Sequence, residues 1–457
     1  MDLASDVNLL SALSRDRSQH VFVWLFNIGA EEVWHPGSRA IADPAEQTVV
    51  NRMEEMNLLL CRRQDILVLR EQPQPHFLEM LQQMGFAIPR IEVPESSDPL
   101  TPITELVLAD EGLLQRLRTE SEAAGGAYLV PYAVTWKEEE VAARCSLTLL
   151  GADSDLCARV NDKIFSRRMA EDLGFPVTEG AVCRNETEVQ EACGRIAAAA
   201  VSPVRFIIKQ PHGASGKGML LVEDLSRLNA VLNVMKRFAG RNSLADGWLV
   251  ERWYGKQLDL NYQIYISPEG EVTMFSLKVQ QLAGTVYTGS RMPAELEKGL
   301  EEEVRGCAEQ LGVSLFAAGY SGIASIDGFV DEDGQLFPVI EINGRFTLST
   351  YISFVSAVLG ERRFLSRYYR VVSVEPLTYE ALCALLRENG LLYGPEHREG
   401  VIVYTAGTLS AARLKQGFIN RIFTLIAADN WEEAEDYARR LEWLFAVQQQ
   451  VQARNSI

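Results

Sequence analysis

The first 150 residues alternate between strand-like and helix-like patterns, and this order restricts the fold more than any other feature of the chain. Apolar runs at 20–26 (HVFVWLF), 65–71 (DILVLRE) and 127–136 (AYLVPYAVTW) are separated by segments such as the amphipathic stretch at 75–86. Strands that alternate with helices favour a parallel sheet covered by helices. We therefore predict a Rossmann-like α/β domain over residues 1–155.

The turn after the first of these strands argues against a dinucleotide cofactor. It reads NIGAEEVWHPG at residues 27–37 and contains only isolated glycines. A dinucleotide-binding turn needs the G-x-G-x-x-G spacing so that the backbone can approach the pyrophosphate. The region is thus expected to have the Rossmann layout without that cofactor.

Length and charge limit the kinds of partner that the protein can have. A chain of 457 residues is long enough for two or three domains. Its formal net charge of −18 opposes binding to nucleic acid or to an anionic membrane surface, because both depend on exposed lysine and arginine. We exclude nucleic acid as the main partner.

The cysteines and the apolar segments indicate a cytoplasmic protein. The seven cysteines are scattered and contain no C-x-x-C pair, so they are expected to be reduced core residues. No apolar stretch reaches the length of a membrane span, and the start of the chain lacks a basic segment followed by an apolar one.

A glycine-rich loop at residues 209–222, KQPHGASGKGMLLV, lies between two strand-like runs. A Walker P-loop requires Ser or Thr after its lysine and a helix that follows; here Gly218 follows Lys217 and a strand comes next. A glycine loop between antiparallel strands could instead close over phosphates through its backbone amides. An ordinary hairpin turn is the alternative, and residues elsewhere must decide between the two.

A helix with clear ends is predicted from the segment VNDKIFSRRMAEDLGFP. Asn161 or Asp162 can cap its N-terminus, and Gly174 suits its C-terminal end. Lys163 falls in the first turn, where a cation opposes the helix dipole. Lys163 is therefore either incidental or held there for an anion, and this residue alone favours the incidental reading.

The segment 319–351 predicts a β-hairpin that carries two carboxylates. Asp327 and Glu341 fall opposite each other to within a register step, and Asn343 projects from the same face as Glu341. Arg345 is expected to continue that face. Oxygen ligands of this kind suit Mg²⁺ that bridges nucleotide phosphates, whereas pairing with arginine or lysine, or exposure to solvent, is the alternative.

Two further segments supply groups that a nucleotide could use. A strand-like run that ends at Glu251 and continues as an extended segment offers a carboxylate, a backbone donor and a backbone acceptor to an adenine edge. Gln257 or Asp259 could reach a ribose. Lys278 and Arg291, farther along the chain, are cations able to meet phosphate charge.

In this order, the features resemble those of the ATP-grasp carboxylate–amine ligases over roughly residues 156 to 360. The matching elements are a lysine at the opening helix, a strand lysine before a glycine flap, a hinge acid and a metal hairpin that ends in E-x-N. The N-terminal region is similar to the pre-ATP-grasp domain of that family. The FNIGAEEVW segment and the length resemble the branch that contains the pheganomycin-type peptide ligase and the butirosin amino-acid to carrier-protein ligase.

The chain departs from the family pattern at the hinge. Gln257 stands where an acidic residue is usual, so the ribose contact is uncertain and Asp259 is the preferred substitute. The E-x-N-x-R string at Glu341 to Arg345 is shared with carbamoyl-phosphate and biotin-carboxylase relatives. That string does not fix the substrate.

The resemblance implies ATP and Mg²⁺ as cofactors and assigns each site residue a role. The expected metal ligands are Asp327, Glu341 and Asn343. The expected nucleotide-binding residues are Lys163, Lys209, His212, Gly213, Ser215, Gly216, Lys217, Gly218, Glu251, Trp253 and Asp259. The expected catalytic residues, placed at the γ-phosphate and the acyl phosphate, are Lys278, Arg291 and Arg345. His212 has no visible partner in the sequence, so a role without chemistry stays open for it.

The resemblance also implies the reaction and the domain plan. A carboxylate of an amino acid or small peptide would attack the γ-phosphate, and an amine would then displace phosphate from the acyl phosphate. A carrier-protein thiol as the acceptor, and a nucleotide-binding regulator without turnover, are the alternatives. The expected plan is a pre-ATP-grasp domain (1–155), an ATP-grasp core (156–375, flap about 204–255) and a C-terminal closing lobe (376–457). The oligomeric state stays open, with a homodimer as one option.

Overall fold

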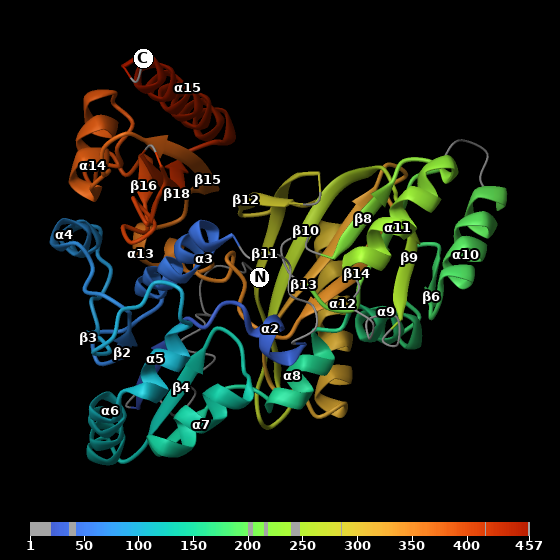
Figure 1. Cartoon of the computed structure of the whole chain (residues 1–457), viewed down its shortest axis with the longest axis horizontal. Helices are drawn as coiled ribbons and strands as arrows, with labels where there is room; N and C mark the ends of the chain where they lie inside the picture. Colours follow the sequence, from blue (N-terminus) through green and yellow to red (C-terminus); the bar gives the residue numbers. More distant parts are fainter. Residues whose placement is uncertain are drawn as a thin grey trace.

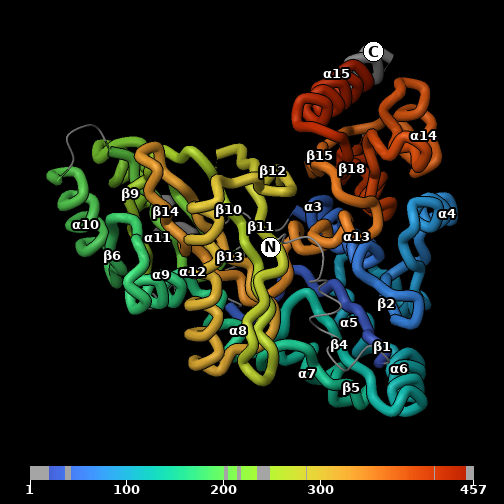
Figure 2. The backbone as a smooth tube through the Cα atoms, turned by 180° about the vertical axis from the view of Figure 1, so that it is seen from behind, coloured from blue at the N-terminus to red at the C-terminus, as the bar shows by residue number. Residues whose placement is uncertain are grey.

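A computed structural model of the chain describes residues 20–35, 43–199, 204–213, 218–238, 247–284, 286–415 and 417–455. Three sheets organise these residues, and Figures 1 and 2 show them from opposite sides. The fold is mixed α/β, as predicted. Only the features that position the candidate site are developed below.

The N-terminal domain contains a five-stranded parallel sheet in the order β3-β2-β1-β4-β5. The predicted Rossmann-like arrangement is confirmed. The strand order reverses between β1 and β4, so the loops after these two strands leave the sheet edge side by side. The strands are β1 (Val21–Leu25), β2 (Ile66–Val68), β3 (Arg90–Glu92), β4 (Ala127–Pro131) and β5 (Leu147–Leu149). The helical segments are α2 (Ala30–Trp34), α3 (Pro44–Asn51), η2 (Arg52–Leu59), α4 (Pro75–Gln83), α5 (Ile103–Ala109), α6 (Glu111–Ala123) and α7 (Trp136–Arg144).

The second sheet has nine strands and forms the centre of the molecule (Figure 1). Its order is β14-β13-β10-β11-β12-β15-β18-β16, and β17 pairs with β18 at the side. The strands nearest the candidate site are β10 (Lys256–Ile266), β11 (Val272–Ala283), β12 (Val286–Met292), β13 (Gly322–Asp331) and β14 (Leu336–Asn343). The helices around them are α8 (Ser154–Val160), α9 (Lys163–Asp172), α12 (Lys298–Ala317) and α13 (Val355–Leu359).

One face of this sheet is apolar because its strands alternate strictly. Tyr262, Ile264, Ile326 and Ile342 are buried on the same side as Leu311 of α12, in one hydrophobic cluster. Successive residues of a strand point to opposite faces, so the residues between them all project to the other face. That other face carries the polar residues of the site.

A small antiparallel sheet in the order β6-β9-β7-β8 holds the glycine-rich loop. The loop joins β7 to β8, which confirms the predicted strand, loop and strand order and the absence of a P-loop helix. This unit also contains helical segments, and it forms one end of the molecule in Figure 1. The elements are β6 (Gly180–Cys183), α10 (Glu186–Ala199), β7 (Phe206–Lys209), β8 (Met219–Val222), η3 (Leu225–Arg227), α11 (Leu228–Phe238) and β9 (Trp248–Arg252).

The C-terminal part of the chain extends the nine-stranded sheet instead of forming a separate one. β15 pairs with β12 on one side and with β18 on the other. The sheet therefore runs without a break from the strands of the site into the last part of the chain. The elements are β15 (Arg363–Ser373), α14 (Tyr379–Glu388), β16 (Gly400–Val403), β17 (Ala412–Arg413), β18 (Phe418–Ala428) and α15 (Trp431–Asn455).

The C-terminal elements also rest on the N-terminal domain, and the two regions lie together in both views (Figures 1 and 2). The rings of Phe77 in α4 and Tyr379 in α14 are 5.0 Å apart. Gln74 Oε1 accepts a hydrogen bond from the Tyr379 amide at 2.9 Å. Glu55 Oε2 accepts hydrogen bonds from the amides of Ala406 and Gly407 at 2.6 and 2.7 Å.

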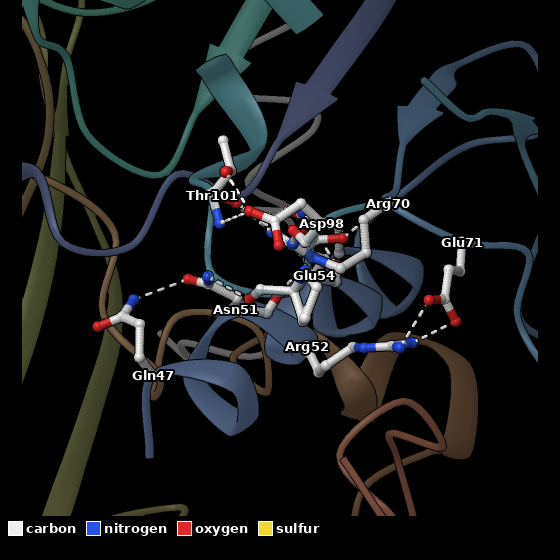
Figure 3. Close-up of polar contacts among 10 residues, drawn as sticks. Gln47, Asn51, Arg52, Glu54, Arg70, Glu71, Asp98 and Thr101 are labelled. Atoms are coloured by element: carbon white, nitrogen blue, oxygen red, sulfur yellow. Dashed lines mark hydrogen bonds and ion pairs between the residues drawn. The ribbon is translucent and has the colours of Figure 1, made fainter. Parts of the chain in front are cut away.

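A polar cluster braces this contact on the N-terminal side (Figure 3). Arg70 pairs with Glu54 at 2.9 Å in the buried interior, and Arg52 donates to both carboxylate oxygens of Glu71 at 2.5 and 2.6 Å. A cavity of about 230 Å³ is lined by these four side chains and by Gly407. Both arginines already have carboxylate partners, so we assign the cluster to packing between the two regions.

Candidate active site

Four adjacent strands bring four polar residues into one cross-strand row. The registers pair Glu341 of β14 with Asp327 of β13, Asp327 with Asn261 of β10, and Asn261 with Lys278 of β11. Residues directly opposite on paired strands share a face and lie side by side. The predicted juxtaposition of Asp327 and Glu341 is thus confirmed, and Lys278 lies at the far end of the same row.

A second row runs beside the first and consists of Asn343, Ser325, Gln263 and Ser276, on the same four strands. Asn343 was predicted from the sequence, whereas the other three residues were missed. Gln263 Nε2 donates to Ser349 Oγ at 2.7 Å, while its Oε1 atom is buried and has no hydrogen-bond partner among the described residues. The available signal was the alternation of polar and apolar residues in β10, where Asn261 and Gln263 stand two apart.

Asp327 is held by amides. Asn261 Nδ2 and Gln280 Nε2 donate to its Oδ1 atom at 2.9 and 2.8 Å, and Asn343 Nδ2 lies 3.5 Å from Oδ2. Burial, with the neighbouring charge of Glu341, raises the pKa of Asp327 to about 6, although the two amides oppose this shift. Two close carboxylates with no shared cation are costly, and a divalent ion would relieve the repulsion.

Glu341 connects the hairpin to the start of α9. Its Oε1 atom pairs with Lys163 Nζ at 2.9 Å, and the same ammonium donates to the carbonyl oxygen of Gly213 at 2.8 Å. Burial by itself would raise the pKa of Glu341, but the charge and hydrogen bond of Lys163 lower it overall. Asp162 caps the helix by accepting from the Ile164 amide at 2.7 Å. Lys163 is therefore buried between Glu341 of the hairpin and Gly213 at the start of the glycine loop, which argues against the incidental reading.

Lys209 and Glu251 face this cluster from the small sheet. Lys209 Nζ pairs with Glu251 Oε2 at 2.6 Å, and Arg167 Nη1 lies 3.2 Å from Glu251 Oε1. Burial raises the pKa of Glu251, but Lys209 and its other partners lower it below the ordinary value. Ile207 and Leu249 project from the same face by strand alternation and by register, and both are buried. Together these residues form a surface with an apolar patch beside charged groups.

The hinge after β9 is already partly hydrogen-bonded. The Arg252 amide donates to Glu179 O at 2.8 Å, and the Trp253 amide donates to Arg205 O at 2.9 Å. These two amides are thus occupied in the structure, so an adenine contact would use carbonyl groups here or amides farther along. Asp259, the expected ribose contact, pairs with Lys256 at 2.5 Å. The Lys256 ammonium also lies 5.4 Å from the centre of the Trp253 ring.

The glycine loop begins and ends with positive φ angles. Gly213 has φ of 143° and Gly218 has φ of 78°, and both lie in the region that favours glycine. His212 stacks face to face on His35, with ring centres 3.2 Å apart. Burial, with the charges of His35 and Lys163, lowers the pKa of His212 to about 3. The predicted contacts of Ser215, Gly216 and Lys217 lie outside the described residues.

Lys278 differs from the other lysines of the site. Its Nζ atom donates to Ser353 Oγ at 2.7 Å and to Ser276 Oγ, and no carboxylate of the described chain pairs with it. Burial lowers the pKa of Lys278 to about 7. A buried ammonium with only hydroxyl partners is suited to an incoming anion.

Arg345 turns away from the hairpin toward the N-terminal domain. Its Nε atom lies 2.8 Å from Glu31 Oε1, and its Nη1 atom donates to Tyr132 OH at 3.1 Å and to Phe346 O at 3.0 Å. Arg345 lies past the end of β14, so the expectation that it continues the face of the hairpin holds only in part. Its charge still acts on both Asp327 and Glu341.

The structure does not bring Arg291 to this cluster. Arg291 pairs in register with Val279, whereas Lys278 and Gln280 project from the opposite face of β11. Its guanidinium lies 4.3 Å from the Trp431 ring and 3.8 Å from Glu435, both on α15. The physical reason is a β-bulge at Thr288 of β12, opposite Gln281 and Leu282, which shifts the register by one residue and so reverses the face on which Arg291 lies.

The donor set fits Mg²⁺ bound together with phosphates. Asp327, Glu341 and Asn343 offer two carboxylates and an amide oxygen in adjacent positions, and hard oxygen ligands of this type suit Mg²⁺. The described part of the chain contains no group of three His, Cys, Asp or Glu residues placed to hold a metal by themselves. Both the donor set and the lack of a third carboxylate among the described residues agree with a Mg²⁺ ion whose coordination shell is completed by phosphate oxygens.

Family models match three consecutive parts of the chain. A pre-ATP-grasp domain matches residues 53–147, an ATP-grasp domain matches residues 160–349, and a PGM1 C-terminal domain matches residues 381–441. The chain therefore contains a pre-ATP-grasp domain followed by an ATP-grasp domain. The resemblance predicted from the sequence elements is confirmed.

Two curated relatives of this ATP-grasp protein are ligases named for L-glutamate. The [Butirosin acyl-carrier protein]--L-glutamate ligase of Niallia circulans is 27% identical over 72% of this chain and 73% of its own length. The L-propargylglycine--L-glutamate ligase of Streptantibioticus cattleyicolor is 26% identical over 75% of each chain. Both similarities extend over most of the ATP-grasp protein.

Solved structures share the fold at low identity. N5-carboxyaminoimidazole ribonucleotide synthetase in its ADP complex aligns with 93% of this chain at a TM-score of 0.53 and 15% identity. The biotin carboxylase domain of Hydrogenobacter thermophilus 2-oxoglutarate carboxylase, with MgADP and bicarbonate, aligns with 92% at a TM-score of 0.56 and 14% identity. Similarity at this level supports the fold.

None of the helices that the structure describes combines the length and apolar character needed to cross a membrane.

Proposed function

We propose that this ATP-grasp protein is an ADP-forming ligase that activates the carboxylate of an amino acid or small peptide and couples it to an amine. The observation that carries the proposal is the cross-strand row from Glu341 through Asp327 and Asn261 to Lys278. One end of this row is suited to a metal ion on phosphates. The other end is Lys278, a buried lysine with no carboxylate partner among the described residues, and it is suited to the carboxylate that receives the phosphoryl group.

The reaction needs positioning and charge neutralisation more than a protein nucleophile. Mg²⁺, held by Asp327, Glu341 and Asn343, would neutralise charge on the nucleotide phosphates. Lys163 and Lys209 would bind the phosphate oxygens, and each would exchange a carboxylate partner for phosphate. The loop between Gly213 and Gly218 would cover the phosphates and exclude water.

The acyl half of the site is assigned to Lys278 and Arg345. The carboxylate oxygen of the substrate attacks the γ-phosphorus, the bond to the β-phosphate oxygen breaks, and ADP leaves. The acyl phosphate that forms carries charge that Lys278 and Arg345 would stabilise. Gln263, with a buried carbonyl oxygen lacking a described partner, is placed to accept an N–H group of the same substrate.

The names of the relatives refine the substrate class. Both curated relatives are named as ligases of L-glutamate, and this name supports an amino acid as one substrate. A carrier-protein thiol is retained as the alternative acceptor because the first relative is named for an acyl-carrier protein. The two readings share the acyl phosphate and differ only in the group that attacks it.

The domain boundaries, the cellular compartment and the oligomeric state are also proposals. We retain 1–155, 156–375 and 376–457 as the three regions of the chain, although the large sheet continues across the last boundary. The seven cysteines are all unpaired, which supports a reducing setting such as the cytoplasm. A homodimer is retained as the proposed assembly.

The proposed function is tested by release of ADP from MgATP against a panel of amino acids and dipeptides, with hydroxylamine to trap an acyl phosphate. Hydroxamate formed from one carboxylate would establish the activation step and identify the donor. If ATP binds and no carboxylate gives hydroxamate or accelerates ADP release, the ligase assignment is wrong and a regulator becomes the better reading.

A further inference from the structure

The edge of the N-terminal sheet reaches into the acyl half of the site. The loops after β1 and β4 are joined where the strand order reverses, because Asn27 Nδ2 donates to Ala133 O at 2.7 Å and the Ala133 amide donates to Asn27 Oδ1 at 3.1 Å. Glu31 and Tyr132 leave the sheet at this point and contact Arg345. Open α/β sheets bind ligands at such a reversal of strand order.

The contact between Glu31 and Arg345 is close but incomplete. Glu31 Oε1 and Arg345 Nε are 2.8 Å apart, yet neither buried atom makes a hydrogen bond with any described residue. Arg345 is only 7% exposed, and Tyr132 and Phe346 hold its Nη1 atom in place. Buried charged groups whose hydrogen bonds are unmet cost free energy. A ligand that brings an anionic oxygen to Arg345 and an N–H group to Glu31 would satisfy both.

We propose that Glu31 binds the protonated amine of the acceptor substrate, next to the acyl phosphate on Arg345. This inference rests on the proposed ligase function. The N-terminal domain then supplies the acceptor subsite, while the large sheet supplies the donor and metal subsites. The acceptor that this arrangement fits is an α-amino acid or another primary ammonium compound.

The charge of Glu31 separates an amine acceptor from a thiol acceptor. A carboxylate attracts an ammonium group and repels a thiolate, so Glu31 favours the first and disfavours the second. Glu31 is held in the first turn of α2, where the helix dipole favours a carboxylate. The subsite therefore selects amines before any step of the chemistry.

The test uses Glu31→Gln in the full-length enzyme, with Glu32→Gln as the matched control because Glu32 is exposed on the same helix. Hydroxylamine is largely uncharged at mildly alkaline pH, whereas L-amino acids carry a protonated amine there. We expect Glu31→Gln to keep the wild-type yield of hydroxamate and to raise the KM for the amino-acid acceptor about tenfold or more. Glu31→Asp, which keeps the charge, should recover part of the loss.

Two results would overturn the inference. If Glu31→Gln lowers hydroxamate and amide formation in the same proportion, Glu31 only positions Arg345. If amide formation and its KM are unchanged, Glu31 does not bind the acceptor. Calorimetric titration of L-amino acids into wild-type and Glu31→Gln protein decides the question without turnover, because equal affinities would refute the ammonium site. Absence of hydroxamate in the wild type would instead refute the proposed function. The calorimetric affinities would still test the ammonium site, because they do not depend on turnover.

Discussion

The two halves of the candidate site treat their cations differently. On the nucleotide side, Lys163 and Lys209 each pair with a buried carboxylate, at 2.9 and 2.6 Å. On the proposed acyl side, the partners of Lys278 among the described residues are the hydroxyl groups of Ser276 and Ser353. The comparison indicates that Lys163 and Lys209, proposed to bind phosphate, are held in place by carboxylates, whereas the described chain offers Lys278 no carboxylate.

The largest loss of activity is expected from substitution of Glu341, the carboxylate proposed to bind the metal. Glu341→Gln should reduce Mg²⁺-dependent ADP formation at least about 100-fold, because a metal ligand is lost. Thermal unfolding should show a folded protein, and Glu332→Gln, exposed in the turn of the same hairpin, is the control. Undiminished turnover would show that the metal lies elsewhere.

Lys278→Met should separate the two halves of the site. We expect hydroxamate formation to fall about 100-fold, because a cation that stabilises the acyl phosphate is gone. The dissociation constant of ATP, measured by calorimetry, should stay near the wild-type value. A matching loss of ATP affinity would place Lys278 on the nucleotide and remove the distinction between the halves.

Glu251→Ala should act mainly on the nucleotide half. The affinity for ATP is expected to fall about tenfold, because Lys209 loses its charged partner and the hinge loses a carboxylate. Calorimetric titration with ATP measures the effect, and circular dichroism checks that the small sheet remains folded. Unchanged nucleotide affinity would mean that the adenine lies elsewhere.

Stability as a function of pH should sharpen the comparison further. Burial lowers the pKa of Lys278 from its ordinary 10.5 to about 7, so between these pH values the unfolded chain binds more protons than the folded chain. The contribution of Lys278 to the free energy of unfolding therefore rises with pH across this window. Lys278→Met should be more stable than wild type at pH 7, and this advantage should shrink toward pH 10 in denaturant titrations.

Lys209→Met tests the stability of the lysine on the nucleotide half of the site, for comparison with Lys278→Met. It should be less stable than wild type by about 2 kcal/mol, because Glu251 loses one of its charged partners. Equal changes in stability for the two lysine variants would contradict the difference on which the comparison rests.

The smallest effect is expected from Arg291. Arg291→Ala should change hydroxamate formation only a few-fold, because its guanidinium lies against Trp431 and Glu435 of α15. The same assay serves as the measurement, with Arg345→Ala as the comparison that should lose most activity. If Arg291→Ala loses as much hydroxamate formation as Arg345→Ala, Arg291 takes part in catalysis after all.

Local patterns explain what the sequence predicted correctly. The alternation of strands and helices in the N-terminal domain, and the hairpin that places Asp327 against Glu341, depend on neighbours a few residues apart. The face of Arg291 depends on a single bulge at Thr288 of β12, and without that bulge Arg291 would lie opposite Lys278. The contact of Glu31 with Arg345 joins residues from two domains, so no local pattern could indicate it.

The continuity of the large sheet has a mechanical consequence. The sheet leads from the metal hairpin through β15 into the C-terminal elements, which rest on the N-terminal domain, which in turn contacts Arg345 at the hairpin. Each of these three regions therefore contacts the other two. A movement of one region relative to a second would have to break its contacts with the third. The small sheet that carries Lys209 lies outside these three regions. Because the small sheet contacts them mainly through α9, we expect it to be the part that moves most readily when ATP enters and ADP leaves.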